Sequence, residues 1–219
     1  MNFKRLLFIS LLFFSCEESV KNKSTSNKDL KYYNLKYETI YDDNSTKIEI
    51  AIPNNFNKMK LNNPDSDILG QFEYLDNSVS SGKGLYSINI QKLESKNTIL
   101  FDNEIEYLKI VKKGIDDKFN GNLDEASRIF SPVLKNLKIA DFEYDLKING
   151  KYFHKQIRYY LDKRLEGTEF ENSNVTSFHY YTLHNKRKYS FDINYYGDDK
   201  GLSSLIGMFN SIAESIKFD

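Results

Sequence analysis

Apolar and polar residues alternate along much of the chain, and a period of two is typical of strands with one buried face. In the first half, Ile48, Ile50 and Ile52 alternate with other residues until Pro53 ends the run. Residues 37–41, joined to this run by a short polar segment, are its expected hairpin partner. The same alternation predicts further strands at 71–75, 84–93, 140–148, 153–161, 175–183 and 188–196.

Helical spacing of the apolar residues occurs in three other places. The clearest helix is expected over 105–119. Residues 123–137 predict a second helical piece, interrupted near Pro132 because proline removes a helix hydrogen bond. A last helix is expected from about residue 200, and 215–218 predicts a short closing strand.

Short turns join the strands of the second half into hairpins. Asn149-Gly150 is the strongest two-residue hairpin signal in the chain, and residues 184–187 connect the next pair. The pattern therefore predicts an α+β fold, a mostly antiparallel sheet covered by helices. The length of the chain suits one globular domain, which we expect over 37–219.

The first residues have the pattern of an export signal. Lys4 and Arg5 precede an apolar run over 6–14, which ends before Glu17 and Glu18. This run is about half the length of the roughly 20 apolar residues that a membrane-spanning helix needs. We interpret residues 1–15 as a signal peptide.

A cysteine follows this signal directly, after a small residue. The pair Ser15-Cys16 resembles the lipobox of bacterial lipoproteins, in a looser form like that of Bacteroidetes-type bacteria, since Phe13 and Phe14 depart from the commonest pattern. The resemblance implies that Cys16 carries lipid, including palmitate, and anchors the protein to a membrane. The alternative is an incidental thiol, but Cys16 is the only cysteine and has no disulfide partner in the chain.

The residues after the cysteine are polar and are expected to form a flexible tether over 16–36. Glu17-Glu18 resembles an acidic signal that sends some Bacteroidetes lipoproteins to the cell surface. The expected location is the bacterial cell envelope, in the outer membrane, on its periplasmic face or at the cell surface.

Charge excludes one class of partner. Without Lys4 and Arg5, which lie in the signal peptide, 29 basic residues remain against 31 acidic ones. Proteins that bind nucleic acid need a net basic face, so no nucleic acid partner is expected.

The candidate chemistry of the chain is sparse. His154 and His179 fall on neighbouring predicted strands and could bind a metal with Asp162 or Glu143, which would suit a metal-dependent enzyme or hydrolase of the envelope. The alternative is that both histidines are ordinary strand residues. No nucleophile, phosphate-loop or dinucleotide motif is present, so we expect no enzyme, no metal and no cofactor.

Aromatic residues are concentrated on the strands of the second half. One face of that sheet must be core, and the other is either covered by helices or open as an aromatic platform for a protein partner or glycan. A cavity between sheet and helices would instead suit a carrier of lipid or another apolar ligand. The aromatic residues concerned are Tyr152, Phe153, Tyr159, Tyr160, Phe178, Tyr180, Tyr181, Tyr189, Phe191, Tyr195 and Tyr196.

Two stretches resemble the PsbP/Mog1-like domains. Residues 50–56, which read Ile-Ala-Ile-Pro-Asn-Asn-Phe, are similar to the start of such domains, and the hairpin 180–195 and the ending 209–218 are similar to their end. The resemblance implies a small α/β/α sandwich that binds partners or assists assembly, with no shared catalytic residues. With the anchor, this predicts a membrane-bound, non-catalytic binding or assembly module with an envelope protein partner.

Overall fold

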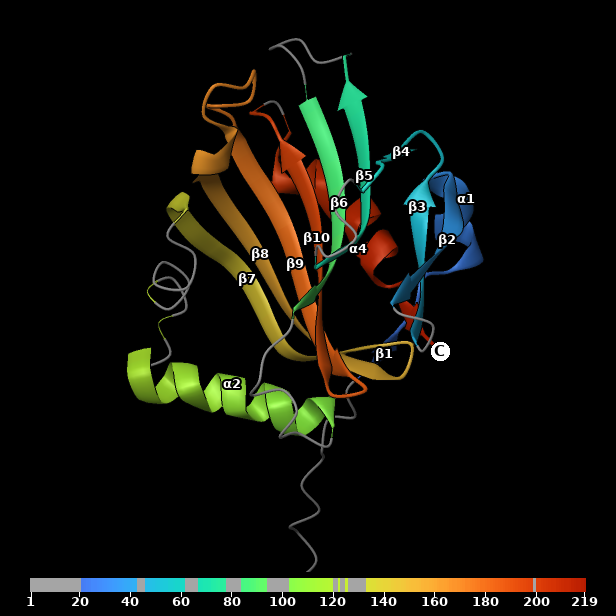
Figure 1. The fold of residues 1–219 in the computed structure, drawn as a ribbon, viewed down its shortest axis with the longest axis vertical. Helices are drawn as coiled ribbons and strands as arrows, with labels where there is room; N and C mark the ends of the chain where they lie inside the picture. The colour runs from blue at the N-terminus through green and yellow to red at the C-terminus, as the bar shows by residue number, and fades with distance from the viewer. Residues whose placement is uncertain are drawn as a thin grey trace, which may run out of the picture.

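The computed structural model describes residues 21–42, 46–61, 67–77, 84–93, 103–119, 122, 125, 133–198 and 200–219. Two sheets organise these residues (Figure 1). In spatial order the larger, eight-stranded sheet consists of β1 (Asn22–Lys23), β7 (Leu134–Ile148), β8 (Lys151–Asp162), β9 (Asn174–His184), β10 (Arg187–Tyr196), β6 (Gly84–Leu93), β5 (Ile68–Asp76) and β4 (Asn57–Lys58). The smaller sheet consists of β11 (Lys217–Phe218), β3 (Thr46–Pro53) and β2 (Leu35–Asp42).

Helices lie on both sides of the large sheet. They are α1 (Asn27–Tyr32), α2 (Glu104–Phe119) and α4 (Leu202–Ala213), with a 3-10 turn η2 (Lys163–Leu165) after β8. On α4, Phe209 packs edge-on against Phe178 of β9, whereas Tyr107 of α2 contacts Tyr181 of the same strand. Residues 178 and 181 point to opposite faces of a strand, so α4 and α2 cover opposite faces.

The α+β class is confirmed, because every pair of neighbouring strands is antiparallel except β1 and β7. The main core lies between the large sheet, α4 and the small sheet (Figure 1). Its largest fully buried side chains include Tyr180, Tyr189, Tyr195, Phe153 and Phe191. We call this the inner face of the large sheet, and the face toward α2 the outer face.

Both hairpins of the second half are confirmed. Asn149 and Gly150 have φ of 46° and 88°, and Asn185 and Lys186 have φ of 48° and 62°. Two successive residues with positive φ are the geometry of the type I′ turn, whose twist matches that of the flanking strands.

The predicted helical piece 123–137 is wrong at its end, where residues 134–137 belong to β7. Leu134 and Lys135 pair with Asp162 and Leu161 of β8. Pairing with a neighbouring strand is a tertiary interaction, and it overrides local helical spacing. Residues 126–132 lie outside the described residues.

The expected tether also differs from the structure. Within 16–36, β1 pairs with β7, and Ser26 caps α1 by accepting a hydrogen bond from the backbone N–H of Asp29 at 3.1 Å. Leu30 and Tyr33 then pack against the core, which supplies the apolar contacts that composition alone did not indicate. The folded unit therefore begins before residue 37.

The aromatic platform is not present among the described residues. Of the eleven aromatic side chains named above, every one is buried or half-buried. Six of them belong to the main core, and Tyr181 on the outer face contacts Tyr107 of α2. The six are Phe153, Phe178, Tyr180, Tyr189, Phe191 and Tyr195.

Two further expectations concern the N-terminus and membranes. The signal peptide and Cys16 lie outside the described residues. No helix within the described ranges is long and apolar enough to cross a bilayer.

Candidate functional site

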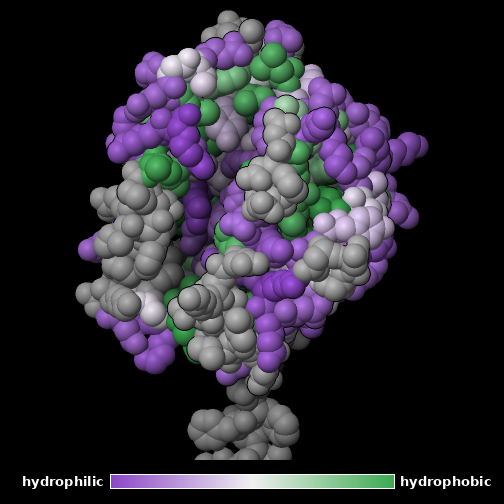
Figure 2. All heavy atoms as spheres, viewed as in Figure 1, coloured by the Kyte–Doolittle hydropathy of each residue, from purple (hydrophilic) through white to green (hydrophobic). Residues whose placement is uncertain are grey.

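A hollow of about 290 Å³ opens on the outer face of the large sheet. Figure 2 shows this side of the molecule, where hydrophilic side chains gather in a depression of the surface. β8, β9 and β10 supply its floor, because alternate residues of each strand point outward. The floor residues used below are Arg158, Tyr160, His179, Ser190, Asp192 and Asn194.

A row of hydrogen bonds runs along β8 toward the hollow. The Nε of Arg158 donates to Oε1 of Gln156 at 2.7 Å, and Nε2 of Gln156 lies 2.9 Å from Nε2 of His154. Because the Gln156 oxygen is engaged by arginine, its amide nitrogen is the donor to His154. The imidazole therefore accepts at Nε2 and carries its proton on Nδ1.

His154 is fully buried under α2. Its ring stacks on Tyr181 with centroids 4.5 Å apart, and Tyr144 contacts it edge-on. Burial, reinforced by the nearby His179 and Arg158, lowers the pKa of His154 to about 2. The side chain is thus a neutral, packed element of the structure at physiological pH, with no described partner for Nδ1.

His179 and Asp192 form a pair on the floor of the hollow. They are directly opposite each other on β9 and β10, and Nδ1 of His179 lies 2.5 Å from Oδ1 of Asp192. Burial and the charge of Arg158 lower the pKa of His179 below its usual value. Burial alone would raise the pKa of Asp192, but His179 and Arg158 lower it overall. The neutral imidazole therefore donates from Nδ1 to an ionised carboxylate, and its Nε2 is an acceptor.

Arg158 is a cation of this floor with no ion-pair partner among the described residues. Nε to Gln156 is the one hydrogen bond that its guanidinium makes to the described residues, and no carboxylate lies within ion-pair distance of it there. The nearby Arg164 is different, because it binds Asp162 through two nitrogens at 2.6–3.1 Å. The terminal nitrogens of Arg158 are donors available to a ligand.

The metal site that the sequence left as an alternative is only partly assembled. His154 and His179 do share the outer face, on neighbouring strands, where His154 pairs with Tyr181 and Gln156 pairs with His179. However, each ring is already hydrogen-bonded to another side chain. Within the described part of the chain, no three His, Cys, Asp or Glu residues are grouped to hold a metal.

The carboxylates proposed to complete that site lie elsewhere. Glu143 is opposite Lys155 in the β7–β8 ladder, and the side chain of Lys155 points to the face opposite His154. Glu143 forms an ion pair with Lys23 at 3.6 Å. Asp162 lies eight residues beyond His154 on β8, or about 26 Å along an extended strand. It binds Arg164 and caps η2. These carboxylates are therefore kept apart from the two histidines by the alternation of side chains and by the order of the strands. The sequence alone does not give the strand order.

A serine, Ser190, lines the hollow next to the His179–Asp192 pair. Ser190 is diagonal to His179 in the ladder, because it pairs with Tyr181. Its hydroxyl makes no hydrogen bond to His179. A nucleophilic serine is activated by a base within hydrogen-bond reach, so this geometry supplies a polar floor and no assembled triad.

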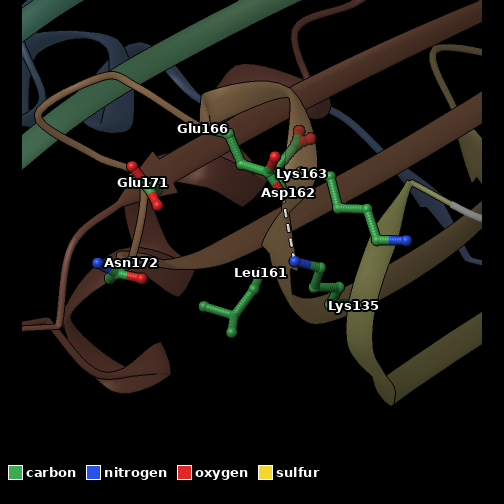
Figure 3. Close-up of a pocket in the computed structure, with 7 residues that line it drawn as sticks. All are labelled: Lys135, Leu161, Asp162, Lys163, Glu166, Glu171 and Asn172. Atoms are coloured by element: carbon green, nitrogen blue, oxygen red, sulfur yellow. Dashed lines mark hydrogen bonds and ion pairs between the residues drawn. The ribbon is translucent and has the colours of Figure 1, made fainter.

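A second, smaller pocket of about 70 Å³ lies at the end of β8 (Figure 3). Lys135 reaches across it to Glu166 at 3.2 Å, and both side chains are at least half exposed. Exposed ion pairs of this kind contribute little to stability. The third histidine, His184, ends β9 against Phe218, where burial lowers its pKa to about 4.

Sequence reasoning did not identify Arg158, Asp192 or Asn194 as site residues. One signal was available: the outward positions of β9 and β10 carry short polar side chains, and Ser177, Ser190 and Asn194 are buried. Solvent-facing strands usually carry longer charged residues at such positions.

No protein-family model and no curated protein matches the sequence. Among solved structures, the chain is similar to PsbP (CyanoP) of Synechocystis sp. PCC 6803, with 13% identity over 83% of this chain and 91% of that one, and a TM-score of 0.45. LpqN of Mycobacterium tuberculosis, described as involved in cell envelope biogenesis, is 10% identical over 90% and 99% of the two chains, with a TM-score of 0.45. The Ran-binding protein Mog1p of Saccharomyces cerevisiae is 10% identical over 84% and 95%, with a TM-score of 0.42.

PsbP and Mog1 proteins, which the sequence resembles, are thus among the structures similar to this chain. At these TM-scores the likeness concerns only the general arrangement of sheet and helices. The function must be argued from the chain itself.

Proposed function

We propose that this protein is a lipid-anchored, non-catalytic binding module of the bacterial cell envelope. The observation that carries the proposal is the order of the first sixteen residues: a basic start, a short apolar run, and Ser15-Cys16 at its end. A run of this length directs export without spanning the membrane. Diacylation of Cys16 would then hold the folded unit at a membrane surface, because each buried methylene contributes about 0.8 kcal/mol.

The binding role is supported by the hollow on the outer face. A small-molecule pocket is typically a concavity with a few convergent polar groups, and its volume starts at roughly 300 Å³. The hollow, at about 290 Å³, lies just below this range, and it has a polar lining that includes an arginine and a His–Asp pair. Its polar floor favours a polar ligand over a lipid chain, whose burial there would leave these groups without hydrogen bonds.

The anchor is tested by replacing Cys16→Ala in the full chain and fractionating the cells. The expected result is loss of metabolic palmitate labelling and release of the protein from the membrane fraction, with the domain still folded. Ser15→Ala, which keeps a small residue before the cysteine, is the matched control and should stay lipidated. Membrane retention and labelling of the Cys16→Ala protein would refute the anchor.

The partner is tested by affinity capture of the intact lipoprotein from detergent-solubilised envelope. A specific envelope protein or small molecule should be retained by the native chain. Capture that returns no specific protein or ligand would count against a binding module.

A further inference from the structure

The floor of the hollow combines a donor-rich cation with a cluster of acceptors. Arg158 presents terminal guanidinium nitrogens, and beside it Asp192 and His179 present the oxygen and nitrogen that their mutual bond does not use. The His179 and Asp192 side chains are 13% and 23% exposed, so both can be reached from the hollow. A ligand that satisfies this floor must accept hydrogen bonds at one end and donate them at the other.

The local charge is positive. The ion pair with Asp162 neutralises Arg164, so Arg158 and Asp192 are the charged side chains to consider on the floor of the hollow. Lys188 adds a second cation close enough to interact with both, and its Nζ lies 4.6 Å from the Tyr181 ring centroid. Among the described residues, two cations therefore act on one carboxylate: Arg158 lines the hollow, and Lys188 lies over Tyr181, outside the lining. A site with this balance attracts an anion.

We propose that the hollow binds a small oxyanion that also carries hydroxyl groups, such as an acidic monosaccharide. A planar guanidinium binds carboxylate and phosphate oxygens through parallel hydrogen bonds, so Arg158 is the residue for the anionic group. Hydroxyl groups then donate to Asp192 and His179. The ring of Tyr160 supplies an apolar wall beside them.

The size of the hollow limits the ligand. At about 290 Å³ it lies at the lower end of the volumes found for small-molecule pockets, which suits one sugar ring and excludes a folded polymer. This proposal names the ligand class of the proposed binding module and rests on that function. It does not depend on Cys16.

The test is calorimetric titration of the full-length protein in detergent micelles with four probes. D-glucuronate and glucose 6-phosphate carry an anionic group and hydroxyls, D-glucose lacks the charge, and acetate lacks the hydroxyls. At least one of the first two should bind, at least 10-fold more tightly than glucose and acetate. Their relative affinity distinguishes a carboxylate from a phosphate ligand.

Variants locate the binding. Arg158→Gln should weaken the acidic sugar at least 10-fold, whereas Lys163→Gln removes the same charge from an exposed residue outside the hollow and should leave affinity unchanged. If Arg158→Gln does not fold, Arg158→Lys keeps the charge but loses the planar fork, and should still weaken binding.

Three results would overturn the proposal: no binding of either acidic sugar at 10 mM, equal binding of glucose, or unchanged affinity in the folded arginine variant. Release of the Cys16→Ala protein from membranes is measured separately. A failed titration with a confirmed anchor would therefore reject the ligand and leave the proposed anchoring standing.

Discussion

Asp42 at the end of β2 accepts a hydrogen bond from the phenol of Tyr189 in β10, with 2.7 Å between the two oxygens. The carboxylate is 1% exposed and also binds Nζ of Lys92 in β6 at 2.9 Å. One side chain of the small sheet thus joins two neighbouring strands of the large sheet. This polar contact lies at the edge of an otherwise apolar interface and orients the two sheets.

Replacing Asp42→Asn should therefore destabilise the fold. The substitution removes the carboxylate that Lys92 and Arg187 both bind, and because these two cations are partly exposed, the expected cost is about 1–3 kcal/mol of unfolding free energy. Urea unfolding followed by circular dichroism measures it. Glu166→Gln breaks an exposed pair with Lys135 and is the control, with little change expected. Equal losses in the two variants would contradict a structural role for Asp42.

Acid should weaken the fold through His154. The unfolded chain takes up a proton there near the ordinary pKa of 6.5, whereas the folded chain stays neutral down to about 2. The unfolded state thus binds more protons in this window, so stability falls as pH falls. Between pH 7 and pH 5 this side chain alone should remove about 2 kcal/mol.

His154→Phe tests the assignment, because phenylalanine keeps an aromatic ring between Tyr144 and Tyr181 and cannot take up a proton. Its unfolding free energy should drop by about 2 kcal/mol less than that of the native protein over the same pH range. The remaining drop includes His184, whose pKa of about 4 acts in the same direction. Identical pH dependence in both proteins would contradict a buried neutral His154.

The turn residue Asn149 should matter for more than its backbone conformation. Its Nδ2 donates to the carbonyls of Glu214 and Ile216 at 3.0 and 2.9 Å, which ties the hairpin to the C-terminal segment. Asn149→Gly keeps the positive φ but removes both bonds, and should cost about 1–3 kcal/mol in denaturant unfolding.

Asn185 offers the matched control. It has nearly the same φ, 48°, in a turn of the same type, and its exposed side chain makes no comparable bond. Asn185→Gly should change stability by a few tenths of a kcal/mol at most. A loss as large as that of Asn149→Gly would assign the effect to the turn backbone.

Local features of the fold were predictable, and long-range ones were not. The Asn149-Gly150 hairpin follows from two adjacent residues that adopt positive φ readily, so sequence alone predicts it. The hairpin of β2 and β3 was also predicted, but not its placement in a separate sheet. That depends on β11, which pairs Phe218 with Ile48 across most of the chain.

The site shows the same division. The shared face of His154 and Arg158 follows from alternation along the strand 153–161, because it needs only a period of two. The pairing of His179 with Asp192 depends on the register between β9 and β10, and the sealing of His154 depends on α2, which lies far away in sequence. The sequence of a strand predicts which residues share a face of the sheet, but it does not predict which residue of the neighbouring strand lies opposite each of them.

The pairing of β1 with β7 limits how far the folded domain could move away from a membrane anchor. If Cys16 carries the lipid, only five residues separate it from Asn22 in β1, and the six extended steps between the two residues reach about 20 Å. The β1 end of the domain then stays within about 20 Å of the membrane surface. Any partner must therefore reach a domain that is held at this membrane surface. The domain can meet only molecules that are bound to the same surface or pass close to it.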